Sequence, residues 1–107
     1  MKVNTQELQF TELARFAKAM SHPVRLQILD ILSKSACCYT GDITDELPIA
    51  RSTLSQHIKE LKDSGLIQGE YNPPKIKYCL NAENWEKAKC LFTDFLNQSI
   101  KTTNCNT

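Results

Sequence analysis

A run of small hydroxyl, amide and basic side chains between residues 51 and 59 carries the clearest chemical signal in this chain. Serine and threonine hydroxyls hydrogen-bond phosphates or bases, a glutamine amide can hold adenine through two hydrogen bonds, and basic side chains neutralise phosphates. Such a set predicts contact with double-stranded DNA through the major groove. The predicted contact residues of this run are Arg51, Ser52, Thr53, Ser55, Gln56, His57 and Lys59.

Residues 51–64 have the periodicity of a helix that would present this set on one side. The apolar face of that helix consists of Leu54, Ile58 and Leu61. The roughly opposite face includes Ser52, Gln56 and Lys59. Gly65 is placed to end the helix. His57 lies nearer the apolar side than Gln56 does, so both helix packing and a phosphate contact remain open for this side chain.

Thiolates are the second source of chemistry. The adjacent Cys37 and Cys38, together with Cys79, would give a soft metal ion the sulfur ligands it prefers if residues 36–39 pair with the strand that holds Cys79. Adjacent residues of an extended chain point to opposite faces, so joint chelation by Cys37 and Cys38 needs a local turn. Thiol oxidation and simple packing are the alternatives. We expect Cys90 to pack as a small hydrophobe.

The segments before residue 51 supply helices that can hold these residues in place. Amphipathic periodicity predicts a first helix over residues 5–20, and Pro23 starts a second helix that runs to about Ser33. The second helix is apolar on most sides, which predicts that it is the surrounded, central element of the core. A short third helix is expected over residues 41–47, ended by Pro48.

The segments after residue 65 predict a hairpin and a last helix. Apolar and polar residues alternate over residues 67–71 and 75–80, which is typical of a two-stranded hairpin, or wing. A last helix is expected from Asn84 to about Ile100. Its apolar stripe is wider than the last helix of so small a monomer needs, which predicts a partner subunit. Residues 101–107 are polar and are expected to form a flexible tail.

The order of these elements is that of a winged helix-turn-helix. A polar outer face alone is weak evidence, because any amphipathic surface helix has one. Two helices, a short helix, a longer polar-faced helix and a hairpin follow one another over nearly the whole chain. This order predicts a mainly α fold with a small β-hairpin. We expect one DNA-binding domain, residues 1–100, that forms a homodimer through its N- and C-terminal helices.

The residues also resemble those of the ArsR (SmtB-type) family of winged-helix metalloregulators. The matching stretches are FAKAMSHPVRLQI from Phe16 to Ile28, GDITDEL from Gly41 to Leu47, STLSQHIKELKDSGL from Ser52 to Leu66 and IKYCL from Ile76 to Leu80. The resemblance implies operator binding by a homodimer and repression that an inducer relieves. By position, it implies recognition-helix contacts at Ser52, Ser55, Gln56 and His57 and wing contacts at Lys75 and Lys77.

Some positions depart from the pattern of that family. Ala50 stands where the family often has a serine that caps the recognition helix, and losing this cap costs about 1 kcal/mol. Residues 39–41, Tyr-Thr-Gly, occupy the place of a Cys-x-Cys metal site, which leaves the three cysteines above as candidate metal ligands. The last helix has no histidine, which argues against the family's zinc site there. We expect no required cofactor, with arsenite, antimonite or another soft metal ion as inducer.

Composition sets further limits on function. The formal net charge is only +1, so DNA binding must rest on local clustering and on doubling in a dimer. No stretch approaches the roughly 18 apolar residues of a membrane helix, and residues 1–10 lack the apolar core of a signal peptide. We therefore expect a cytoplasmic protein with reduced thiols and no membrane partner. The chain has no glycine-rich phosphate loop and no convincing nucleophile–base pair, which argues against an enzyme.

One alternative from a different functional class remains. A winged helix can also serve as a protein-interaction module without an inducer site, and the small net charge permits that role.

Overall fold

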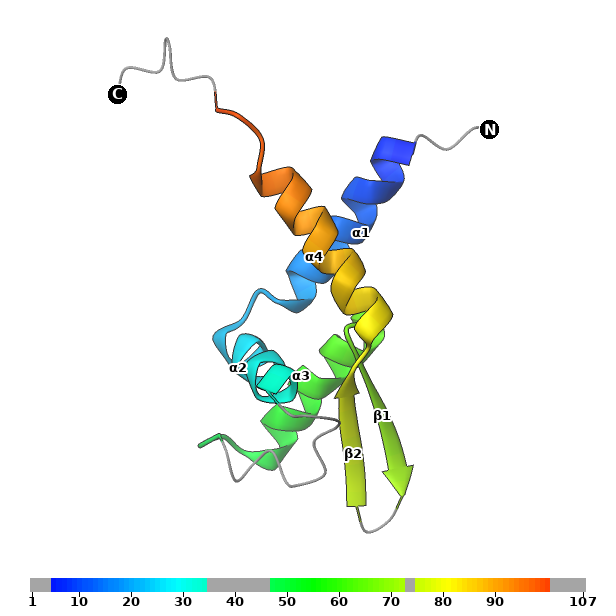
Figure 1. The fold of residues 1–107 in the computed structure, drawn as a ribbon. Coiled ribbons are helices and arrows are strands. Elements are labelled where there is room, and N and C mark those ends of the chain that lie inside the picture. Colours follow the sequence, from blue (N-terminus) through cyan, green and yellow to red (C-terminus); the bar gives the residue numbers. More distant parts are fainter. Residues whose placement is uncertain (1–4, 35–46, 73–74, 101–107) are drawn as a thin grey trace, which may run out of the picture.

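The computed structural model describes residues 5–34, 47–72 and 75–100, with the backbone alone at residues 70–72, 75 and 76. The elements in chain order are α1 (Thr5–Ala19), α2 (Pro23–Lys34), α3 (Arg51–Ser64), β1 (Ile67–Asn72), β2 (Lys75–Leu80) and α4 (Ala82–Leu96). The two strands pair as an antiparallel hairpin. In Figure 1, α1 and α4 cross at one end of the molecule, and α2, α3 and the hairpin lie at the other. The predicted mainly α fold with a small β-hairpin is confirmed.

The core forms where the first three helices meet the hairpin. Phe16 of α1, Ile28 of α2 and Leu61 of α3 are fully buried, as is Leu66 at the start of the hairpin. The predicted apolar face of α3 is confirmed as core, because its leucines and isoleucine are all buried. Helix α1 contacts both α3 and α4, whereas α2 contacts α3 and β2. None of the described helices is both long and apolar enough to cross a membrane.

The prediction that α2 is surrounded on most sides is wrong. Its buried residues are Ile28, Leu29 and Leu32. Leu26 keeps 48% of its surface exposed. Among the described elements, α2 packs mainly on α3 and β2, and Leu26 lies on a side of the helix that these elements do not cover.

Gly65 ends α3 as expected. Its backbone has a φ of 89°, in the left-handed region that favours glycine, and its N–H donates to the Lys62 carbonyl at 3.0 Å. A Cβ atom at this position would lie 2.8 Å from Asn84 Nδ2. That amide donates to the Gly65 carbonyl at 2.8 Å. The turn after α3 is therefore joined to the start of α4 by a contact that only glycine permits.

Helix α4 begins and ends earlier than the predicted range of 84–100. The Asn81 side chain accepts a hydrogen bond from the Asn84 N–H at 3.1 Å, and this cap places the first helical residue at Ala82. The helix ends at Leu96. Apolar periodicity continues to Ile100, but that side chain is 82% exposed, so no packing within the subunit stabilises a further turn.

Two expectations fall on residues outside the described ranges. The predicted short helix over residues 41–47 lies there except for Leu47, which is buried in the core. The predicted tail over residues 101–107 lies there entirely.

The missing cap of α3 generates a stability prediction. Ala50 occupies the capping position with φ −65° and ψ 145°, which is the backbone of a cap, but it makes no side-chain hydrogen bond. A serine hydroxyl there would accept from an N–H of the first turn. We expect Ala50→Ser to raise the free energy of unfolding by about 1 kcal/mol, measured by urea denaturation. The control is Ala50→Val, which offers no acceptor, and equal stability of the two variants would contradict the prediction.

Candidate nucleic-acid interface

Helix α3 has a buried side and an exposed polar side. The buried side chains are Leu54, His57, Ile58, Leu61 and Ser64. The exposed side holds the predicted contact residues of this helix apart from His57, namely Arg51, Ser52, Thr53, Ser55, Gln56 and Lys59. The structure therefore brings these six side chains together on one outward surface, which we call the polar face of α3.

The start of α3 is electrostatically suited to an anion. The first turn contains no acidic residue, and Ala50 provides no side-chain acceptor for its N–H groups. Unpaired N–H groups and the helix dipole together attract phosphate at a helix N-terminus. Arg51 adds a formal positive charge at the same end. This end of the polar face can therefore attract a phosphate group.

Existing contacts leave the polar face able to bind. The Ser55 hydroxyl donates to the Arg51 carbonyl at 3.0 Å, and its oxygen keeps lone pairs that can accept. Lys59 Nζ lies 3.1 Å from Asp63 Oδ2, in an ion pair whose two side chains are 69% and 63% exposed. Exposed pairs of this kind contribute about 0.3–0.5 kcal/mol, so a phosphate can replace the carboxylate at little cost.

His57 occupies a different position, on the packed side of α3 with 9% of its surface exposed. Its Nδ1 accepts a hydrogen bond from Arg25 Nε at 3.2 Å, and its ring centroid lies 4.3 Å from that of His22. Burial lowers the pKa of His57, and the nearby His22 and Arg25 lower it further. The structure therefore gives His57 a packing role, and its predicted phosphate contact stays a prediction.

Sequence reasoning did not find this cluster of His22, Arg25 and His57. In the described part of the chain, Arg25 donates to the His57 imidazole and, from Nη1, to the Lys18 carbonyl at 3.2 Å. Arg25 and His57 are 32 residues apart, and no local pattern reports such a contact.

The wing places its two lysines on β2. Lys77 pairs in register with Glu70 and is exposed, and Lys75 pairs with Asn72 at the turn end of the hairpin. Near the base of the wing, a Cβ atom on Gly69 would lie 2.9 Å from the Tyr78 ring. The aromatic ring therefore covers the glycine and stiffens the hairpin. Burial raises the pKa of Tyr78, so its hydroxyl stays protonated at neutral pH.

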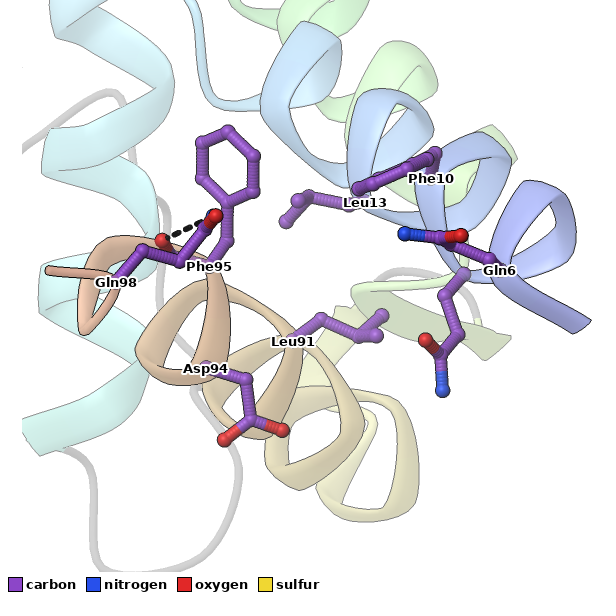
Figure 2. Close-up of a pocket in the computed structure, with 8 residues that line it drawn as sticks. Gln6, Phe10, Leu13, Leu91, Asp94, Phe95 and Gln98 are labelled. Atoms are coloured by element: carbon purple, nitrogen blue, oxygen red, sulfur yellow. Dashed lines mark hydrogen bonds between the residues drawn. The ribbon is translucent and has the colours of Figure 1, made fainter.

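An apolar surface remains uncovered where α1 and α4 cross. We call Leu8, Phe10, Phe95 and Leu96 the terminal-helix patch, because they are 53%, 48%, 46% and 75% exposed. The Phe10 and Phe95 rings meet edge to face with centroids 6.4 Å apart. Beside them lies an open hollow of about 200 Å³, into which Leu13 and Leu91 point (Figure 2). Several exposed large apolar side chains on neighbouring helices are typical of an interaction surface.

The cysteines are placed differently from the sequence prediction. Cys79 is half-buried on β2 and is disulfide-bonded, against the expectation of reduced thiols. Cys90 carries a free thiol and is exposed, so it does not pack as a small hydrophobe within the single subunit. Cys37 and Cys38 lie outside the described residues. Within the described ranges, no group of three or more histidine, cysteine or acidic side chains is arranged to hold a metal ion.

Comparison with known proteins agrees with this geometry. Residues 20–70 match the model of a helix-turn-helix domain family. The arsenical resistance operon repressor of Staphylococcus xylosus is 34% identical over 97 residues, which cover 91% of this chain and 85% of that protein. The HTH-type transcriptional regulator YgaV of Escherichia coli is 38% identical over 72 residues, covering 67% of this chain and 73% of the relative.

A solved structure extends the agreement to three dimensions. The transcriptional repressor BigR from Xylella fastidiosa superposes with a TM-score of 0.64 at 30% identity, covering 90% of this chain and 95% of the other. The match spans the terminal helices as well as the helix-turn-helix. On these grounds, the chain belongs to the ArsR family of winged helix-turn-helix transcriptional regulators.

Proposed function

We propose that this protein is a sequence-specific repressor that binds double-stranded operator DNA as a homodimer in the cytoplasm. The observation that carries the proposal is the division of α3, whose buried apolar side turns the whole polar face outward. A helix that presents hydroxyl, amide and basic groups together fits the major groove. Repression as the outcome is supported by the relatives, since those of Staphylococcus xylosus and Xylella fastidiosa are named repressors.

Within this proposal, the side chains of the polar face have different roles according to their chemistry. Gln56 reads a base, because an amide offers a donor and an acceptor side by side. The serine and threonine hydroxyls bind bases or phosphates near the start of the helix. Phosphate contacts fall to the basic side chains of helix and wing, namely Arg51, Lys59, Lys75 and Lys77.

The terminal-helix patch supports a second copy as the partner at the crossing of α1 and α4. Covering these four side chains would stabilise a dimer by part of the about 1.5–3 kcal/mol that full burial of an exposed apolar side chain contributes, because three of them are already about half buried. A symmetric dimer can place two recognition helices about 34–36 Å apart, so that they meet successive major grooves. A dimer also presents twice as many basic groups to one duplex. This doubling would compensate for the low net charge of +1 per chain.

Release from DNA is proposed to depend on Cys37, Cys38 and Cys79. Thiolates bind arsenite, antimonite and other soft ions, and the relative from Staphylococcus xylosus is named for an arsenical resistance operon. The disulfide at Cys79 supports thiol oxidation as the alternative signal. Either event would change the wing strand β2, which lies beside α2.

The role of Gln56 is tested by substitution. If its amide reads a base, Gln56→Ala weakens binding to the operator by roughly 1–3 kcal/mol and leaves binding to random duplex nearly unchanged. Binding is measured by fluorescence anisotropy with both duplexes. The matched control is Lys77→Ala on the exposed wing, which weakens both duplexes alike and lowers the salt slope by about 1. Equal losses on the two duplexes for Gln56→Ala would exclude base reading by this residue.

Dimer formation through the terminal-helix patch is tested at Leu96. This side chain is 75% exposed, so Leu96→Glu adds a charge to the patch without disturbing the core. We expect the dimer dissociation constant, measured by sedimentation equilibrium, to rise by about tenfold or more. The control is Leu26→Glu, the same change at a leucine of α2 that is 48% exposed. Wild-type protein that stays monomeric and binds no DNA would favour the protein-interaction module instead.

The inducer site is tested at the adjacent cysteines. We expect the Cys37→Ser, Cys38→Ser double variant to bind operator DNA normally, because neither residue belongs to the polar face. It should no longer release DNA on addition of arsenite, antimonite or peroxide, as read by a mobility shift. The control is Cys90→Ser, which removes an exposed free thiol of α4 and should keep the response. A double variant that still responds would leave both cysteines without a sensing role.

A further inference from the structure

We propose that Arg25 and His57 form a proton-sensitive joint that positions α3, so that DNA affinity falls when the His57 imidazole takes up a proton. The inference rests on the proposed function, because it assumes that α3 reads DNA. It assigns Arg25 and His57 as positioning residues, which act through α3 and do not themselves have to touch the duplex.

The joint ties three helices together through one guanidinium. Arg25 lies on α2, donates from Nε to His57 of α3 at 3.2 Å, and donates from Nη1 to the Lys18 carbonyl of α1 at 3.2 Å. The His22 ring packs against the His57 ring, with centroids 4.3 Å apart and the planes tilted by 44°. The His22 ring is itself held, because its Nδ1 accepts the Val24 N–H at 3.0 Å. A displacement of α3 would therefore disturb contacts to both α1 and α2.

The Arg25–His57 hydrogen bond exists only while the imidazole is neutral. Nδ1 accepts through a lone pair, and in the imidazolium both ring nitrogens carry a proton and can only donate. Protonation of His57 thus removes the acceptor and sets a new positive charge against the guanidinium. A charge-assisted hydrogen bond is replaced by repulsion.

Two side chains among the described residues act electrostatically on His57. The groups whose charge acts on the imidazole are His22, between α1 and α2, and Arg25 of α2. Helix α1 contributes the uncharged Lys18 carbonyl through Arg25, and no described charged side chain of α1 or β1 acts on His57. Both neighbours are basic, so a proton on His57 would add positive charge next to them on the packed side of α3.

The direction of the pH effect follows from the same contacts. The pKa of folded His57 lies below its ordinary value of 6.5, so the opened or unfolded state takes up a proton first as the pH falls. Stability and DNA affinity are therefore complete above pH 6.5 and decline as the pH falls below it. Leu54, Ile58 and Leu61 keep α3 folded in this range, while its orientation is lost. Base reading requires several hydrogen bonds of about 2.7–3.2 Å at once, so a reoriented helix binds weakly.

The test compares wild type with His57→Asn across pH. The asparagine oxygen takes the place of Nδ1 and accepts from Arg25, but it does not titrate. The probe is a duplex selected by the wild-type protein from a random pool at about pH 7.5, and affinity is measured by anisotropy down to about pH 5.5 at constant ionic strength. We expect wild-type affinity to fall about fivefold more than that of His57→Asn. The matched control, His22→Asn, keeps the cap of α2 and should retain the pH dependence.

Parallel pH profiles of wild type and His57→Asn would overturn the joint. A protein that selects no duplex at neutral pH would instead refute the proposed function.

The Arg25–His57 joint is then tested in the free protein, without DNA. NMR follows the His57 imidazole signals and the Arg25 Nε–H signal as the pH is lowered. The joint predicts that His57 protonates below its ordinary pKa and that the Arg25 signal shifts in step with it. An Arg25 signal that ignores His57 protonation would overturn the proposal independently.

Discussion

Burial of the apolar edge of α3 decides where every other side chain of that helix points. Leu61 is completely buried, and Leu54 and Ile58 are 7% and 5% exposed. A buried aliphatic side chain stabilises the fold by about 1.5–3 kcal/mol, whereas an internal hydrogen bond contributes about 1 kcal/mol. Apolar packing therefore selects the side of α3 that faces inward. The weaker Arg25–His57 contact is proposed to set the orientation of the helix once that side is buried. The polar face exists because residues three and four positions apart share one side.

Helix α1 joins the surface proposed for dimerisation to the surface proposed for DNA. Towards α4 it contributes Phe10 to an aromatic contact and Glu12 to an ion pair with Lys87 at 2.7 Å. Towards α3 it buries Phe16 and Ala19. Figure 1 shows the crossing of α1 and α4 at one end and α3 at the other. Since a packed helix moves as a unit, a change in how two copies meet would alter the separation of their recognition helices.

The parts of the fold that could be predicted from the sequence are those governed by neighbours in the chain. The division of α3, its end at Gly65 and the hairpin all follow from periodicity and local backbone preference. The end of α4 could not be predicted this way, because the apolar pattern continues into Ile100 while tertiary packing does not. Leu26 was misjudged for a similar reason, since its exposure depends on which neighbours α2 has.

The residues of the candidate site also fall into those that local sequence can predict and those that depend on distant contacts. Six of its helical residues could be placed from spacing alone, because they needed only the correct face of one helix. His57 could not be placed, because its environment depends on His22 and Arg25, which are distant in the chain. The residue pattern of one helix predicts which side of the helix a side chain is on. The partner of a buried polar side chain depends on the whole fold.

Local charge, and not total charge, can account for the proposed DNA-binding surface in a chain whose formal net charge is +1. Among the described residues outside α3, Asp30 pairs with Lys34 at 2.9 Å on α2, and Glu12 of α1 pairs with Lys87 of α4 at 2.7 Å. Within the described residues, the first turn of α3 contains no acidic residue, and Ala50 provides no side-chain cap for the N–H groups of that turn. Screening limits each exposed charge to a range of about 10 Å at moderate salt, so a phosphate responds to the groups nearest to it. The start of the polar face can therefore attract a phosphate although the chain as a whole is close to neutral.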